Sequence, residues 1–101
     1  TAMHHKLLYL NKLYFGKTVN DFKLKYTNSL WGSCSRKGNI NISTRLLFAP
    51  EEVIDYVMVH ELAHLVHPNH SDAFWSEVER CLPNYMEQEK WLKKHGAECD
   101  F

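Results

Sequence analysis

The chain has 101 residues, of which 45% are hydrophobic and 24% charged, and its 12 basic side chains balance 12 acidic ones. A chain of this size suits one domain, so we expect residues 1–101 to form a single unit. Zero net charge argues against a nucleic-acid binder that relies on a large basic field. The lack of a long apolar run argues against a transmembrane helix, so we expect no membrane partner.

The three cysteines, Cys34, Cys81 and Cys99, predict neither a disulfide framework nor a cysteine-type zinc site, because their number is odd and none are in C-x-x-C spacing. We therefore expect a reducing, cytoplasmic environment. In so small a domain, a bound metal can give the stabilisation that disulfides give elsewhere. We expect Cys34 to be a small buried side chain rather than a nucleophile, because the sequence shows no thiolate-stabilising partner.

The first half of the chain predicts one helix and three strands. Apolar residues recur at the spacing of one helix face, and Gly16 is placed to end that helix: Met3, Leu7, Leu10 and Tyr14. The alternating segment 22–26 is typical of a half-buried strand, and residues 27–29 then turn the chain. Segments 30–34 and 39–43 predict two further strands joined by the loop 35–38.

The second half predicts three helices. Pro50 suits the first turn of a helix that runs to Val66 and is apolar on nearly all sides. Ser71 can cap a second helix that ends near Cys81, and a last helix begins near Tyr85. The expected fold is therefore α+β, with a small antiparallel or mixed sheet of about three strands packed on the central helix and flanked by N-terminal and C-terminal helices.

The central helix contains the pentapeptide His60-Glu61-Leu62-Ala63-His64, which matches the pattern H-E-x-x-H. Residues four apart on a helix have Cβ atoms about 5–6 Å apart on one face. Both imidazoles can therefore converge on one metal ion. Glu61 flanks that face, where a carboxylate can accept a proton from metal-bound water and deliver it to a leaving amine. The pattern predicts a metal-dependent hydrolase with Glu61 as general base.

A pattern of five residues also occurs by chance, and buried His and Glu side chains can form plain hydrogen-bond networks. Here, however, three polar residues interrupt an apolar helix, and burying them unpaired would cost several kcal/mol. A divalent ion would remove that cost. The pattern therefore favours a metal site, and one zinc ion, Zn2+, is the expected cofactor.

The residues leave the third protein ligand open. His67 lies seven residues after His60, which is about 10.5 Å along a helix axis and too far for one tetrahedral ion. Pro68 ends the helix, so His70 can fold back toward the metal. Glu77 in the following helix is the alternative. We favour His70, and three protein ligands would leave the fourth position for water, as in catalytic zinc sites.

Several segments together resemble a known family. In chain order they are Trp31-Gly32-Ser33-Cys34-Ser35, Ile40-Asn41-Ile42, Ile54-Asp55-Tyr56-Val57, the H-E-x-x-H pentapeptide, and His70-Ser71 followed by Phe74-Trp75. The region from about Leu30 to Gly96 resembles the YgjP-like and SprT-like zinc metallopeptidases. This resemblance implies a peptidase with His60, His64 and His70 as zinc ligands and Glu61 as the catalyst.

The resemblance also implies a small sheet over the active-site helix, with an edge strand that binds substrate. We expect that strand to be the segment 39–43, with Asn39, Ile40 and Asn41 as substrate-binding residues. YgjP-like proteins usually carry a longer N-terminal region, and in its shortness this chain is similar to the minigluzincins. That name implies a glutamate as third ligand, which keeps Glu77 open.

The minigluzincins are associated with latency imposed by their own C-terminal segment. The tail 97–101 of this chain carries a thiol, two acidic side chains and a terminal carboxylate, all of which can bind zinc. The hypothesis is that the tail occupies the cleft of its own or a neighbouring molecule, with self-association as a consequence. The alternative is a frayed chain end.

Other residues near the motifs have less specific expectations. Trp31, Phe74 and Trp75 are expected mainly in the core, because aromatic side chains dominate core burial. Asp55 either orients a ligand histidine or is a solvated helix residue. His67 and Tyr85 are the candidates for a group that stabilises an oxyanion.

Two other functions compete with the peptidase. Metal-dependent endoribonucleases of the YbeY type share the spacing H-x3-H-x5-H, but typically have glycine where this chain has Glu61. A non-catalytic, zinc-stabilised interaction module would have no use for that carboxylate. We therefore predict a zinc metalloendopeptidase that acts on protein or peptide substrates, and we do not expect nucleic acid as a direct ligand.

Overall fold

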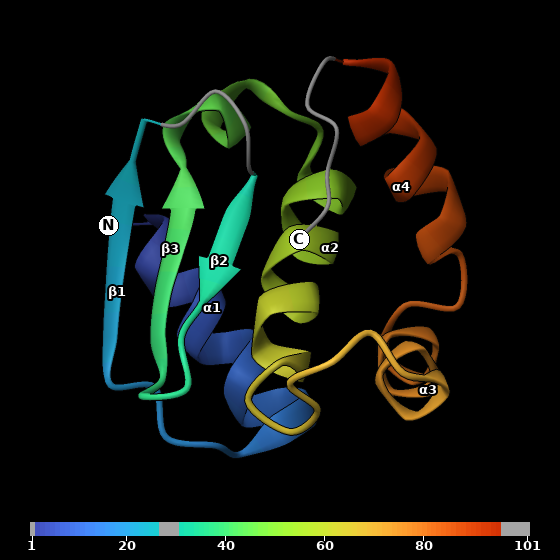
Figure 1. Cartoon of the computed structure of the whole chain (residues 1–101). Coiled ribbons are helices and arrows are strands. Elements are labelled where there is room, and N and C mark those ends of the chain that lie inside the picture. Colours follow the sequence, from blue (N-terminus) through green and yellow to red (C-terminus); the bar gives the residue numbers. More distant parts are fainter. Residues whose placement is uncertain (1, 27–30, 96–101) are drawn as a thin grey trace.

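A computed structural model of the protein describes residues 2–26 and 31–95, and Figure 1 shows their arrangement. The chain begins with α1 (Ala2–Leu10), which continues into one turn of π-helix, η1 (Asn11–Phe15). The strands and the 3-10 helix after them are β1 (Asp21–Lys25), β2 (Gly32–Cys34), β3 (Asn39–Ser43) and η2 (Thr44–Phe48). The second half forms α2 (Glu51–Ala63), α3 (Asp72–Cys81) and α4 (Tyr85–Lys94). The predicted turn at 27–29 and the tail 97–101 lie outside the described residues.

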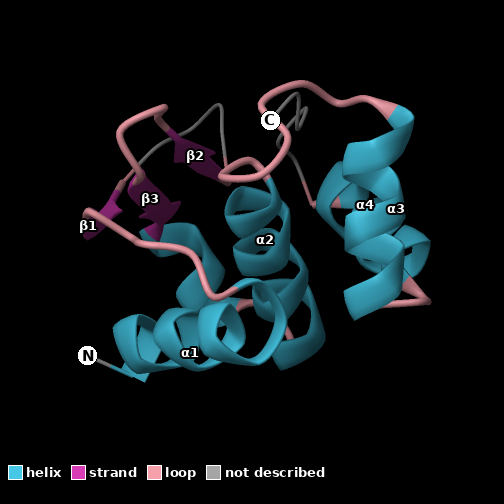
Figure 2. Ribbon diagram, turned by 90° about the horizontal axis from the view of Figure 1, so that it is seen from below, coloured by secondary structure: helices cyan, strands magenta, loops and turns pink. Residues whose placement is uncertain are grey.

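The three strands form one mixed sheet in the order β1-β3-β2, with β1 parallel and β2 antiparallel to β3. Figure 2 shows α2 between this sheet and the pair α3 and α4. The central helix contacts β2, β3 and each of the other three α-helices. The predicted α+β fold, with a small sheet on a central helix and helices on both sides, is confirmed. No helix in the described ranges is long and apolar enough to cross a membrane.

The central helix is buried because the sequence is apolar on nearly all of its faces. From Tyr56 to Ala63 every side chain is buried, including His60 and Glu61. The helix ends at Ala63 rather than at the predicted Val66, and the chain continues in a tight turn in which Leu65 N donates to Leu62 O at 3.0 Å. Pro68 follows two residues after this turn. The tighter turn satisfies carbonyls that the helix end leaves free.

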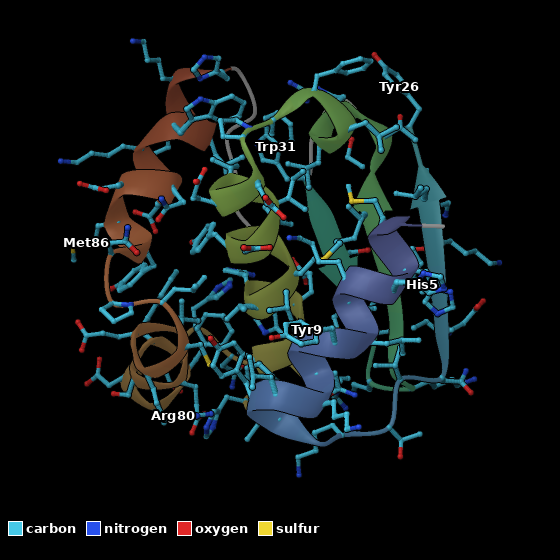
Figure 3. The ribbon with its side chains drawn as sticks, turned by 180° about the vertical axis from the view of Figure 1, so that it is seen from behind. His5, Tyr9, Tyr26, Trp31, Arg80 and Met86 are labelled. Atoms are coloured by element: carbon cyan, nitrogen blue, oxygen red, sulfur yellow. The ribbon has the colours of Figure 1, made fainter. Side chains whose placement is uncertain are left out.

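The N-terminal helix packs its predicted face against α2. Met3, Leu7 and Leu10 are all buried, whereas Tyr9, labelled in Figure 3, lies on the outer face of α1. An ion pair also links the two helices, with Lys6 Nζ 2.6 Å from Asp55 Oδ1 and 2.8 Å from Glu51 Oε1. Asp55 therefore serves the contact between α1 and α2.

The sheet order shows that the expected edge strand is wrong. β3 lies in the centre of the sheet, where Asn39, Ile40 and Asn41 pair with β1 on one side, and Ile40 and Asn41 also pair with β2 on the other. The hairpin pattern correctly predicted that segments 30–34 and 39–43 pair with each other. It could not predict which of the two strands pairs with β1, because the pairing of β1 with β3 is non-local. The strand at the sheet edge beside α2 is β2.

Two residues of the edge strand β2 direct their backbone hydrogen-bonding groups away from β3. Ser43 N donates to Trp31 O at 2.8 Å and Ser35 N donates to Asn39 O at 3.0 Å. In an antiparallel ladder hydrogen-bonded pairs alternate with non-hydrogen-bonded ones. Gly32 and Cys34 are therefore the non-bonded positions, so their backbone N–H and C=O groups point away from β3 toward the sheet edge.

Trp31, at the start of this strand, ties the sheet to α4. It is buried, as expected for a core residue, and Figure 3 shows it between the sheet and the C-terminal helix. Its ring centroid lies 6.3 Å from that of Trp91 in α4. The guanidinium of Arg45 lies 4.2 Å from the Trp31 centroid, a cation–π contact. These contacts fix the end of β2 that precedes the outward-facing residues.

Gly32 allows β2 to approach α2 closely. A Cβ atom at this position would lie 3.2 Å from three atoms, Glu61 Cγ, Val57 Cγ1 and Asn41 O. Two of these atoms belong to the central helix and one to the neighbouring strand. A larger side chain would therefore push the edge strand away from the helix that carries Glu61.

Substituting Gly32→Ala should destabilise the domain by about 1–3 kcal/mol, because overpacking a tight contact forces its neighbours to move. For a domain of this size, that corresponds to a fall in Tm of at least about 4 °C in a thermal melt. In the double variant Gly32→Ala/Val57→Ala, the loss should be smaller than the sum of the single losses, because the shorter residue 57 makes room. An unchanged Tm in Gly32→Ala would show that the contact is not tight.

Candidate metal centre

Three histidines converge at the C-terminal end of α2. His60 and His64 lie one turn apart on the helix, and His70 returns from the loop that precedes α3. One potential ligand atom from each lies within 4.8 Å of the other two. The side chains differ in exposure, because His60 is buried, His64 partly buried and His70 exposed. The structure thus brings together the three residues that the sequence favoured as ligands.

The separation of the rings suits one small ion. The ring centroids lie 5.0 Å apart for His60 and His64, 5.3 Å for His60 and His70, and 4.8 Å for His64 and His70. A tetrahedral ion with metal–nitrogen distances near 2.0–2.1 Å needs ligand atoms roughly 3.3 Å apart. The exposed His70 sits on a loop and can supply the small adjustment. The geometry therefore fits a divalent metal held by three imidazoles.

The tautomer of His64 is set by the turn that follows the helix. Its Nδ1 lies 3.2 Å from the backbone O of His67. A carbonyl oxygen only accepts, so Nδ1 carries the proton and donates it. Nε2 of His64 then keeps its lone pair for a metal, as in other sites where a second hydrogen bond orients a ligand histidine.

Burial favours the neutral form of His60 and His64. It lowers the pKa of His60 to about 3, with the nearby His70 acting in the same direction. Burial also lowers the pKa of His64, although the neighbouring Glu61 opposes that shift. A histidine must be neutral to bind a metal. Both helix ligands are therefore prepared for an ion at neutral pH, and this supports the fit of a divalent metal to the site.

Glu61 lies beside the histidines and is only 1% exposed. Its Oε2 is 3.3 Å from Nδ1 of His60. Burial raises the pKa of Glu61 to about 7, while His64 and His70 pull it down. A carboxyl group with a pKa near neutrality can both accept and return a proton at physiological pH. The position and the pKa of Glu61 suit a general base.

Two aromatic rings of α3 pack against the three histidines. Phe74 is fully buried, and its ring centroid lies 4.9 Å from His60, 4.5 Å from His64 and 5.1 Å from His70. Trp75 stacks on His70 with centroids 5.8 Å apart and an interplanar angle of 25°. Ser71 caps α3 by accepting from Phe74 N at 3.3 Å. The cap thus fixes the helix turn that carries both rings.

The stack continues beyond Trp75. Its ring lies 5.5 Å from Tyr85 of α4, which in turn stacks on Tyr56 of α2 at 6.3 Å. The exposed ligand His70 is therefore held by a row of rings that leads back to the central helix. Sequence reasoning assigned Trp75 to the core and missed this contact with His70. The sequence did carry a signal for this contact. Trp75 lies only five residues after His70, and a side chain near the start of a helix can face the loop that precedes the helix.

The competing candidates lie elsewhere. The side chain of Glu77 pairs with Arg80, with Oε2 2.8 Å from Nη2, and it is not part of the histidine group. His67 contributes its carbonyl to His64 rather than its ring. Tyr85 belongs to the aromatic stack. The structure thus brings Glu77 into contact with neither the histidines nor Glu61.

A cleft of about 570 Å3 lies beside His64 and His70. One wall of its lining is the continuous segment 32–36, from β2 and the turn after it. The rest of the lining consists of Glu61, His64, Leu65 and residues 68–70. Cys34 is half-buried in this wall rather than fully buried as expected. Burial, together with the charge of Glu61, raises the pKa of the Cys34 thiol to about 12, so it stays protonated and is no nucleophile.

The comparisons with known proteins agree with this site. The family model described as the YgjP-like metallopeptidase domain matches residues 5–95. The chain therefore belongs to the YgjP-like metallopeptidase domain family, as the sequence motifs predicted. The same match favours a metallopeptidase over the endoribonuclease alternative.

Two solved structures share this fold. Abylysin of Pyrococcus abyssi, described as a metallopeptidase zymogen, is similar with a TM-score of 0.80 and 26% identity, covering 92% of this chain and 93% of that one. Jannalysin of Methanocaldococcus jannaschii, also described as a metallopeptidase zymogen, has a TM-score of 0.78 and 18% identity, covering 92% of this chain and 95% of that one. The second likeness concerns the fold alone.

A curated relative has a different activity in its name. The UTP pyrophosphatase of Escherichia coli (strain K12) is 29% identical over 85 residues, which are 84% of this chain and 51% of that protein. The chain spans about half the length of this relative.

Replacing His70 by alanine should weaken zinc affinity by more than about 100-fold, because removing a ligand costs at least as much as removing a group that orients one. The increase in Tm that saturating zinc gives the wild type should shrink in parallel. Glu77→Ala is the matched control and should bind zinc like the wild type. Competition titration with a chromophoric chelator measures the zinc affinity of each variant, and thermal melts with and without zinc measure the increase in Tm. Tight zinc binding in His70→Ala together with loss in Glu77→Ala would reverse the assignment.

Proposed function

We propose that the chain is a zinc-dependent endopeptidase that hydrolyses peptide bonds with Glu61 as general base. The observation that carries this proposal is the position of Glu61, buried beside three converging histidines at the base of an open cleft. A structural zinc site closed by protein ligands has no use for such a carboxylate. The family to which the chain belongs supports hydrolysis of peptide bonds in particular.

When bound, zinc would supply a Lewis acid for the carbonyl and would lower the pKa of its water ligand to about 7. His60, His64 and His70 are the residues that would hold it. Glu61 accepts a proton on its carboxylate and later returns it to the leaving amine, which its pKa of about 7 permits. Glu61 is buried, and its Cγ lies close to Gly32 of the edge strand.

An extended peptide can bind along the outer edge of β2, which no other strand of the described residues covers. The backbone N–H and C=O groups of Gly32 and Cys34 point to that side, as the hydrogen bonds of Trp31 and Ser35 with β3 require. A peptide added there would continue the sheet by main-chain hydrogen bonds. It would lie over the cleft that residues 32–36 border. β2 thus takes the role that the sequence had assigned to segment 39–43.

A second candidate is hydrolysis of a nucleoside triphosphate. Two observations favour it, namely the name of the curated relative and the presence of Arg36 among the residues that line the cleft. Arginine is well suited to phosphate groups. Zinc held by the same histidines would supply the Lewis acid for a phosphoanhydride as well. The edge strand β2 favours a peptide, so we retain the peptidase as the proposed function and include UTP in its test.

The variant Glu61→Gln should lose at least about 100-fold in kcat on an unfolded protein substrate, because general-base catalysis contributes that much or more. Zinc binding should be retained, since glutamine leaves the three histidines in place. Peptidase activity is measured by release of amino groups, and UTP hydrolysis by release of phosphate and of pyrophosphate, each with and without chelator. Peptidase activity within tenfold of wild type in Glu61→Gln would disprove the general-base role. Zinc-dependent UTP hydrolysis without peptide cleavage would disprove the peptidase.

A further inference from the structure

We propose that Arg36 determines substrate specificity, by selecting peptides that carry an acidic side chain close to the cleaved bond. This inference rests on the proposed peptidase function and names its substrate class. Arg36 lies two residues after the edge strand β2 and lines the cleft together with residues 32–35. A peptide paired with β2 would therefore pass this side chain on its way across the site.

The turn that carries Arg36 is fixed at both ends. Gly38 N donates to Ser35 O at 3.0 Å, which closes a four-residue turn with Arg36 and Lys37 at its centre. Asn20 N donates to Gly38 O at 2.9 Å, so the turn is also held by the segment before β1. Gly38 has a φ of 84°, in the region that favours glycine. The backbone that presents Arg36 is therefore well defined, although its side chain is exposed.

Arg36 is the single Lys or Arg side chain among the described residues that line the cleft. Within the described ranges its guanidinium has no acidic partner, whereas Arg80 is paired with Glu77 and Lys6 with Asp55. The one acidic group of the cleft lining is Glu61, which is buried and serves the reaction. The guanidinium is permanently charged. The cleft thus offers one unneutralised cation and no competing acid at its rim.

The guanidinium has N–H donors and no acceptor, which matches the acceptor-only oxygens of a carboxylate. The neighbouring hydroxyls are engaged with β3 instead, because Ser33 Oγ accepts from Asn41 Nδ2 at 3.3 Å and Ser35 Oγ accepts from Asn39 N at 3.2 Å. We assign the carboxylate to a substrate Asp or Glu because the neighbouring strand edge fits a peptide backbone.

Charge reversal at position 36 tests the assignment. Wild type and variants are first given peptides from a digested proteome, and mass spectrometry locates the cleaved bonds. Matched synthetic peptides then carry Glu, Gln or Lys at the position nearest Arg36. In the wild type, kcat/KM should be about fivefold to tenfold higher for Glu than for Lys, as an exposed ion pair allows. Arg36→Glu should reverse that order, and Arg36→Gln should remove the preference.

Lys37→Glu is the matched control, because it changes the net charge by the same amount on the adjacent residue of the turn, and Lys37 does not line the cleft. It should keep the wild-type preference for Glu. Equal preference for Glu and Lys in the wild type, or the same reversal in Lys37→Glu, would overturn the role of Arg36 while leaving the peptidase intact. No peptide cleavage together with UTP hydrolysis that Arg36→Glu abolishes would overturn both, and would assign Arg36 to phosphate.

Discussion

The burial of His60 and Glu61 inside the apolar helix α2 is the constraint on which the rest of the structure depends. His60 and Glu61 are each only 1% exposed, and burying polar groups without partners costs several kcal/mol. The neutral form of His60 reduces this cost, because burial lowers the pKa of its imidazole to about 3. A divalent ion bound by His60, His64 and His70 would give the buried groups a partner, and its binding energy would add to the stability of this small fold.

The other elements act on this helix in separate ways. The ion pairs of Lys6 with Glu51 and Asp55 hold α1 against its start. Gly32 lets the edge strand lie within contact of Glu61, so a peptide bound to that strand would lie close to the proposed general base. On the opposite side, Phe74 and Trp75 hold the three histidine rings. The reaction site is therefore built where one helix meets an edge strand on one side and an aromatic wall on the other.

Local patterns in the sequence predicted the features that depend on neighbours in the chain. The H-E-x-x-H spacing predicted that His60 and His64 share one helix face, because that depends on helix geometry alone. Pro68 favoured His70 as the third residue of the group, because a proline ends the helix and lets the chain turn back. The position of β3 could not be obtained in this way, since its second neighbour β1 is joined by non-local pairing. The stacking of Trp75 on His70 and the place of Arg36 in the cleft likewise depend on how separate elements meet.

The central claim is that one divalent metal binds to His60, His64 and His70. The most direct test is a crystal of the zinc-loaded protein, with anomalous diffraction recorded on both sides of the zinc absorption edge. The account predicts a single strong peak with three imidazole nitrogens at about 2.0–2.1 Å, and with Glu61 outside the coordination shell. A peak bound by Glu77 instead of His70, or no metal at these histidines after zinc loading, would contradict it.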